Sequence, residues 1–323
     1  MLDLIVVGLG PAGLALAHRA DQRGLQVVGV DPNPEWDHTI GVWADEVPEW
    51  LDVPERGRCR PRVRANGVTR ELARDYVTVD SKAFRARYTT FPVIRHSATI
   101  VDAHSVHTGP TRELLQAQRV VDARGWQHPT GPVQQAAGYL ADDGEAWWMD
   151  VTGDFFTYSI PVGDRWLVEK TLLISENPLP WPELECEYPA VERVLFPMRV
   201  PRYTGPAIPF GVRAGMLNPI SGYSVTTAWN SVDDVLDGNY PWQRPRWRIE
   251  QALLRRGQQL LLNVDNERFF EEVFRLDDGT LRQLLQLGNL TGTVRGMWPL
   301  FRQAPWLRRA CIRAMFSTST QRR

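Results

Sequence analysis

The chain has 323 residues, of which 43% are hydrophobic and 23% charged, and its formal net charge is −1. This globular balance provides no field that would attract nucleic acid, and no apolar run is long enough to span a bilayer. The three cysteines, Cys59, Cys186 and Cys311, form no CxxC motif, and the histidines show no zinc-ligand spacing. We therefore expect a reducing, cytoplasmic compartment, no disulfide framework and no metal site.

The N-terminal segment carries the strongest motif of the chain. Residues 3–8 are a short β-branched run that predicts a buried parallel strand, and residues 14–20 predict a helix that stops at Gly24. Between them stands a loop of the G-x-G-x-x-G pattern, Gly8-Leu9-Gly10-Pro11-Ala12-Gly13. Residues 25–31 predict a second strand, which ends in Asp31. This order of elements predicts a dinucleotide-binding unit.

Each residue of the motif has a physical reason. Gly8 allows the tight turn, Gly10 lets the backbone approach a diphosphate, and Gly13 permits close packing of helix on strand. The helix N-terminus presents free N–H groups to the phosphates, and Asp31 can accept hydrogen bonds from ribose hydroxyls. The dinucleotide is FAD or NAD(P). We favour FAD because the rest of the chain does not alternate strands with helices.

The middle of the chain shows weaker patterns. Residues 32–74 predict a loop followed by an Arg-rich stretch without periodicity. A helix is expected over 81–88, with Asp80 or Ser81 as its N-cap. Residues 119–125 predict a buried strand that ends in a glycine turn, a position that returns to the cofactor in a dinucleotide fold.

The later segments change in character. Residues 131–175 alternate aromatic and polar side chains, which predicts antiparallel strands and a candidate substrate domain. The glycines of residues 211–224 indicate backbone packed against a ligand, followed by a helix from about Pro219. Residues 246–315 predict helices.

Several ordered segments resemble the motifs of the lycopene cyclases, FAD-dependent carotenoid cyclases of the aromatic-hydroxylase-like flavoprotein group. The segments that carry the resemblance are residues 8–13 with Asp31, Gly41-Val42-Trp43 with Asp45-Glu46, Val121-Asp122-Ala123-Arg124-Gly125, Met149-Asp150, residues 156–161, Leu167-Val168-Glu169-Lys170-Thr171, Phe196-Pro197-Met198 and residues 215–224. The chain departs from the family at Lys170, where a second acid is usual, and at Asn218, where His is usual.

The resemblance implies an α/β fold in which a Rossmann-like FAD-binding domain, of the aromatic-hydroxylase and geranylgeranyl-reductase type, is interrupted by an antiparallel β-sheet substrate domain. A helical C-terminal region follows. We expect the FAD-binding domain over 1–36, 75–130 and 203–240, the substrate domain over 37–74 and 131–202, and the helical region over 241–323.

The resemblance also implies site residues. The expected FAD contacts are Gly8, Gly10, Pro11, Ala12, Gly13, Asp31, Val42, Trp43, Asp122, Gly125, Gly215, Met216, Pro219, Gly222 and Tyr223. Glu169 is the expected catalytic acid and Asp150 a second candidate. The residues alone leave open that Glu169 is a solvent-facing strand acid and that Asp150 is a turn acid.

The implied activity is a redox-neutral cyclisation of lycopene or a related polyene or terpenoid. The family uses reduced FAD, with NAD(P)H as a possible electron donor. An acid protonates a terminal double bond, the cation closes a ring, and a proton is lost. Burial of Glu169 in an apolar strand would raise its pKa and keep it protonated. The alternatives are an isoprenoid reductase or monooxygenase of the same fold, or a flavin-binding homologue without catalysis.

The C-terminal stretch, residues 297–316, mixes Trp, Leu, Ile and Phe with Arg. This composition suits an interfacial segment on anionic lipid, and it equally suits an amphipathic helix packed on its own domain. A lipid-borne substrate favours peripheral contact with the inner face of a membrane.

Overall fold

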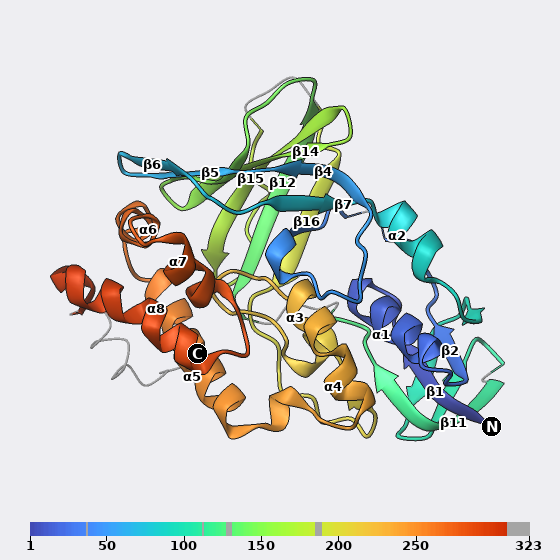
Figure 1. The fold of residues 1–323 in the computed structure, drawn as a ribbon. Helices are drawn as coiled ribbons and strands as arrows, with labels where there is room; N and C mark the ends of the chain where they lie inside the picture. The colour runs from blue at the N-terminus through green and yellow to red at the C-terminus, as the bar shows by residue number, and fades with distance from the viewer. Residues whose placement is uncertain (37, 112, 127–130, 185–188, 309–323) are drawn as a thin grey trace.

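The computed structural model describes residues 1–36, 38–111, 113–126, 131–184 and 189–308. The described residues form two seven-stranded sheets, a three-stranded sheet and a group of C-terminal helices. In Figure 1 the sheet built largely from the middle of the chain (green) stands at the top, the N-terminal unit (dark blue) lies at the lower right, and the last helices (orange and red) gather at the left.

The first sheet contains the predicted dinucleotide unit. Strand β1 (Leu2–Val7) pairs in parallel with β2 (Val27–Val30) and β11 (Glu113–Asp122), and helix α1 (Pro11–Gln22) connects β1 to β2. The remaining strands of this sheet are β8 (Val93–Ile94), β9 (Ala98–Val101), β10 (Ser105–Thr108) and β17 (Ile208–Pro209). Every residue of β2 is buried, as expected for a parallel strand covered on both faces. The predicted strand–loop–helix–strand order is therefore confirmed.

Helix α2 (Ser81–Tyr88) follows the sequence closely. Its N-cap is Asp80, whose carboxylate accepts a hydrogen bond from the backbone N–H of Ala83 at 2.8 Å.

The second sheet is antiparallel over the aromatic-rich part of the chain, as predicted. Its spatial order is β16 (Glu192–Pro197), β12 (Val133–Ala141), β15 (Arg165–Ser175), β14 (Phe155–Val162), β13 (Trp147–Thr152), β5 (Arg62–Ala65) and β6 (Val68–Glu71). Strands β5 and β6 come from the stretch that showed no periodicity. The alternation of buried and exposed residues is hard to detect in β5 because this strand is only four residues long. Its partner β13 also lies far along the chain. The division into domains stays a prediction.

A small third sheet lies between these two. It joins β3 (Gly41–Trp43), β7 (Tyr76–Val79) and β4 (Glu55–Cys59). The prediction of a loop is wrong for residues 41–46, which form β3 and the short 3-10 helix η1 (Ala44–Glu46). The physical reason is tertiary, since Trp43 is buried and packs its ring against Tyr76 and Trp148.

Between residues 211 and 303 the chain is mainly helical. The elements are η2 (Gly211–Ala214), α3 (Val225–Asn230), α4 (Val232–Leu236), η3 (Pro241–Gln243), α5 (Pro245–Leu261), α6 (Asn266–Phe274), α7 (Asp278–Leu285) and α8 (Leu290–Gln303). The predicted helix start at Pro219 is wrong, because α3 begins at Val225. Instead the chain turns at Asn218, whose backbone carbonyl accepts from Gly222 N and whose side chain accepts from Ile220 N, both at 2.9 Å.

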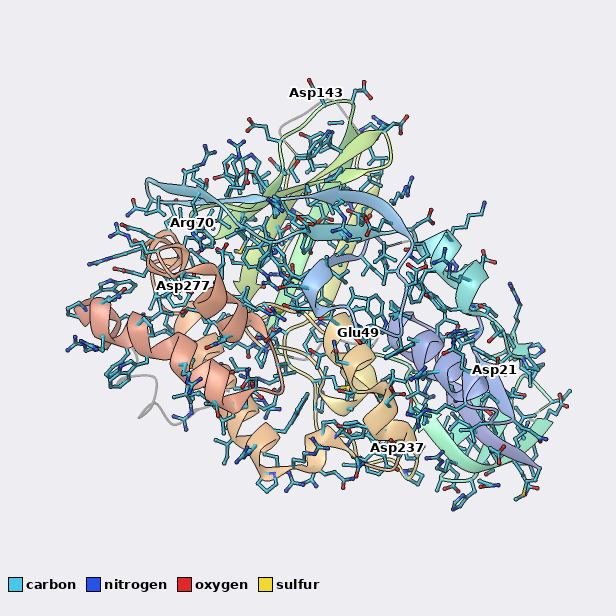
Figure 2. All side chains as sticks on the ribbon, in the orientation of Figure 1. Asp21, Glu49, Arg70, Asp143, Asp237 and Asp277 are labelled. Atoms are coloured by element: carbon cyan, nitrogen blue, oxygen red, sulfur yellow. The ribbon has the colours of Figure 1, made fainter. Side chains whose placement is uncertain are left out.

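The C-terminal helices are fixed to the second sheet. Arg70 on β6 donates to the backbone carbonyls of Phe274 and Leu276 at 2.7 Å and forms an ion pair with Asp278. Figure 2 shows Arg70 near Asp277, at the junction of α6 and α7. Among the described residues no helix is both long and apolar enough to cross a membrane. Residues 309–316 of the predicted interfacial segment lie outside the described residues.

Candidate active site

The glycine loop has the geometry that its pattern predicts. Gly8 has φ +93°, and a Cβ on Gly13 would lie 1.9 Å from the carbonyl oxygen of Gly8, so only glycine lets helix α1 pack this closely. A Cβ on Gly10 would meet no atom within 4 Å. The loop therefore leaves open space above Gly10, where a bound group can approach the backbone. Pro11 starts α1 at a position that needs no N–H, and Ala12 lies against Gly211.

A cavity of about 400 Å³ opens beside this loop. It is lined by Gly8, Asp31, Arg124, Gly125 and Arg213, so three of the predicted FAD contacts lie together. The carboxylate of Asp31 accepts from the backbone N–H of Leu9 at 2.7 Å, which ties the end of β2 to the glycine loop.

Asp122 lies beneath this cavity and is fully buried. Its carboxylate accepts from Arg124 Nε and Nη2 at 2.9 and 2.8 Å, and from Arg213 Nε at 3.3 Å. Burial alone would raise the pKa of Asp122, but the hydrogen bonds from Arg124 and the charges of both arginines hold that pKa below its ordinary value. Asp122 therefore stays ionised and orients two cations toward this cavity.

A second cavity, of about 350 Å³, lies between the sheets and is mainly apolar. We call it the central cavity. Its wall combines the predicted flavin contacts Val42, Gly222 and Tyr223 with the predicted acid Glu169. The aromatic side chains in the wall are Tyr76, Trp148, Phe156, Tyr158, Phe196, Tyr223 and Phe270. The fold thus brings the two kinds of predicted residue to one space.

Glu169 is the acidic residue of this wall. Its side chain makes no hydrogen bond or ion pair within the described part of the chain. Burial, and secondarily the charge of Glu192, raises the pKa of Glu169 to about 8. The carboxyl group is consequently neutral near pH 7 and carries a proton toward an apolar space. Lys170 points to the opposite face of β15, where its Nζ lies 5.6 Å from the ring centroid of Phe155.

Three tyrosine hydroxyls form a cluster in the same wall. Trp148 Nε1 donates to Tyr223 Oη at 2.6 Å, Tyr223 and Tyr76 share a bond of 2.8 Å, and Tyr158 donates to Tyr76 at 3.1 Å. Burial raises the pKa of Tyr223 to about 12, so its hydroxyl stays protonated. One indole N–H and three hydroxyls supply four hydrogens for three bonds. Among the described residues, one donor is therefore left for a group in the central cavity.

The structure does not bring Asp150 to the central cavity. Its carboxylate faces the outer side of the second sheet, where it accepts from Arg64 Nε at 2.7 Å, and Arg64 and Arg62 lie over the ring of Trp147. This ion pair with Arg64 holds the Asp150 carboxylate away from the central cavity, so the structure adds no support to its predicted catalytic role.

Four other predicted contacts lie behind the cavity wall. Trp43 and Met216 are fully buried, Gly215 ends η2 with φ +75°, and the carbonyl of Pro219 accepts from Gln258 Nε2 at 2.7 Å. Asn218, which stands where the family has His, is buried and donates to the carbonyl of Leu285 at 2.9 Å. These residues shape the backbone that faces the cavity.

The sequence did not identify Tyr76 and Glu192 as site residues. A tyrosine in a strand is an ordinary core residue, and only the pairing of distant strands brings these side chains together. The one sequence feature that points to this arrangement is Gly138, because a glycine in the middle of an apolar strand indicates the close approach of another group.

Comparison of the sequence with known proteins identifies the family of this chain. The family model described as lycopene cyclase protein matches residues 3–288. The chain belongs to the lycopene cyclase family. It is 27% identical to the chloroplastic lycopene beta cyclase of an Oncidium hybrid cultivar, over 90% of this chain and 80% of that protein. It is 28% identical to the lycopene beta cyclase of Synechococcus elongatus, over 70% of this chain and 69% of that protein.

Solved structures share the fold. A geranylgeranyl bacteriochlorophyll reductase-like protein from Thermoplasma acidophilum aligns with a TM-score of 0.60 at 14% identity, over 97% of this chain and 99% of that one. A probable FAD-dependent monooxygenase from Pseudomonas aeruginosa aligns with a TM-score of 0.53 at 12% identity, over 85% of this chain and all of that one. The predicted fold class is therefore confirmed.

Proposed function

We propose that this member of the lycopene cyclase family is an FAD-dependent, redox-neutral cyclase of lycopene or a related polyene. The observation that carries the proposal is Glu169, a neutral carboxyl group without a partner among the described residues, in the wall of an apolar cavity. An alkene offers no lone pair, so its protonation needs a donor that still holds its proton in a site closed to water.

The nucleotide end of FAD would occupy the cavity beside the glycine loop. The open space above Gly10, the free N–H groups at the start of α1 and the cations Arg124 and Arg213 would hold the diphosphate, and Asp31 the ribose. The backbone around Val42 and Gly222 would hold the flavin ring beside the central cavity. Reduced flavin, once bound, supplies negative charge that stabilises a nearby cation, and we propose NAD(P)H as the donor that reduces it.

The chain's own residues then carry the reaction. Glu169 gives its proton to a terminal double bond of the polyene, and the resulting carbocation closes a six-membered ring. Loss of a proton from a ring carbon ends the reaction without net oxidation or reduction. The aromatic faces of Trp148, Phe156 and Tyr158 can stabilise the transient cation, and the apolar wall excludes water that would trap it as an alcohol.

Glu169→Gln tests this function. The purified protein is loaded with reduced FAD under anaerobic conditions and given lycopene in detergent, and the product is followed by absorption and mass. We expect an isomer of unchanged mass from the wild type and a loss of about a hundredfold or more in the variant, with FAD still bound. Asp150→Asn is the matched control, since its carboxylate lies outside the central cavity.

The mass of the product separates the alternatives. A reductase adds hydrogen to the polyene, and a monooxygenase adds oxygen. Retention of FAD without any product, from lycopene or related polyenes, would indicate a homologue without catalysis. Near wild-type yield from Glu169→Gln would remove Glu169 from the mechanism.

We also propose a peripheral position at the membrane. Val294 and Trp298, one helical turn apart on α8, are 49% and 57% exposed, and an apolar polyene is delivered from lipid.

A further inference from the structure

Two carboxyl groups flank one glycine on the second sheet. Strand β12 lies between β15 and β16, as Figure 1 shows, and Gly138 of β12 is the register partner of both Glu169 on β15 and Glu192 on β16. Residues paired across neighbouring strands point to the same face of a sheet. A Cβ on Gly138 would lie 2.8 Å from Glu169 Cγ, so the Glu169 side chain leans over β12 in the direction of Glu192.

Glu192 connects this buried position to the surface. Its side chain is 10% exposed, and its carboxylate accepts from the backbone N–H and the hydroxyl of Thr39, both at 2.8 Å. On its outer side, Oε1 lies 3.5 Å from Nδ1 of His38, whose side chain is 69% exposed. Thr39 also lines the central cavity. His38, Glu192 and Glu169 therefore form a row from solvent to the cavity.

The surroundings of the two carboxyl groups separate their protonation states. Glu169 meets an apolar wall, with the Tyr158 hydroxyl from β14 and Glu192 from β16 as its titratable neighbours. Burial would raise the pKa of Glu192, but its hydrogen bonds to His38 and Thr39 and the charge of His38 hold it below the ordinary value. Two carboxyl groups whose pKa values are shifted in opposite directions suit the roles of proton donor and proton carrier.

We propose that Glu192 and His38 form a relay that returns a proton from solvent to Glu169 after each cyclisation. The inference rests on the proposed function, which leaves Glu169 as a carboxylate once the polyene is protonated. In the relay, protonated His38 gives its Nδ1 proton to Glu192, and Glu192 passes a proton to the Glu169 carboxylate. His38 then takes a proton from water. Over one cycle a proton is taken from solvent for the one given to the polyene, the proton lost from the ring carbon goes to solvent, and no electron moves.

Alternative sources within the described residues are poorer. The Tyr158 hydroxyl already donates to Tyr76, and its pKa lies well above the ordinary value because the group is buried.

Glu192 is a positioning residue in this scheme, because it does not line the central cavity and acts through Glu169.

Infrared titration tests the coupling without any turnover. The carbonyl stretch of a protonated carboxyl is followed against pH in the FAD-loaded protein, and the band lost in Glu169→Gln is assigned to Glu169. In Glu192→Gln the repelling charge is gone, so we expect this band to disappear at lower pH than in the wild type. An unchanged midpoint would overturn the proposal.

Pre-steady-state kinetics tests the relay itself. In Glu192→Gln we expect a first turnover at the wild-type rate, followed by later turnovers slowed about tenfold or more. His38→Gln should show the same split more weakly, and we expect it to fold as the wild type because the His38 side chain is 69% exposed. His96→Gln, at another exposed histidine, is the matched control and should turn over as the wild type.

The outcomes are distinguishable from those of the proposed function. If the wild type forms no cyclised product, the proposed function fails. If the wild type cyclises, and Glu192→Gln and His38→Gln both sustain its rate over many turnovers, the released proton returns to Glu169 directly and the relay is refuted.

Discussion

Replacing Glu169 by glutamine should stabilise the protein at alkaline pH, and this follows from the cost of keeping a proton donor in an apolar wall. In the unfolded chain Glu169 ionises at its ordinary pKa of 4.5, whereas in the folded protein its pKa is about 8. Between these values the folded state holds a proton that the unfolded state has lost. The free energy of unfolding therefore falls as pH rises through this window, and the full loss is present above pH 8.

The magnitude follows from the same two values. The interval from 4.5 to 8, at about 1.4 kcal/mol per pH unit, corresponds to about 5 kcal/mol. This figure is an upper bound because, in the protein without bound polyene, water that enters the central cavity can hydrate the carboxylate. Glutamine cannot ionise, so Glu169→Gln escapes this loss. Its stability relative to the wild type should rise by several kcal/mol between pH 5 and pH 9.

Urea unfolding at pH 5 and pH 9, with and without FAD, measures the effect, and the difference between variant and wild type cancels the titration of most other groups. Asp150→Asn is the control, since it removes an ion pair with the exposed Arg64, worth about 1 kcal/mol or less. If the stability difference between Glu169→Gln and the wild type is the same at both pH values, the pKa of Glu169 is not raised in the folded protein. The assignment of Glu169 as the proton donor would then be wrong.

Three further predictions concern the cofactor loop, the hydroxyl cluster and the membrane. Gly10→Val should keep the melting temperature of the wild type but lose FAD, whereas Gly13→Ala should lower the melting temperature because its methyl group would lie 1.9 Å from the Gly8 carbonyl oxygen. Calorimetry measures the melting temperature and flavin fluorescence measures FAD binding. If Gly10→Val binds FAD as well as the wild type, the diphosphate does not lie against Gly10. Tyr223→Phe should cost about 1–3 kcal/mol in urea unfolding, because the Trp148 indole N–H loses its acceptor, and a neutral result would show that the bond is absent. Trp298→Ser should reduce sedimentation with anionic vesicles, and unchanged sedimentation would exclude α8 from the contact.

Local signals in the sequence determined the cofactor end of the molecule. The glycine loop, its flanking strands and the N-cap at Asp80 depend on contacts within a few residues, so the pattern of residue types is enough to predict them. The apolar neighbours of Glu169 along β15 left open whether its side chain faces solvent, and the structure places it in the wall of the central cavity.

Only the tertiary structure decided how the candidate site is assembled. The pairing of β12 with both β15 and β16 places Glu192 across Gly138 from Glu169, and the same fold turns Asp150 outward. The strand β3 also depends on distant partners, since Trp43 packs against Tyr76 and Trp148. Strand register is set by the packing of whole sheets, and a shift of one residue reverses the face of every side chain. The identity of a residue therefore predicts its chemistry, while its neighbours in space are fixed by contacts that the linear pattern does not contain.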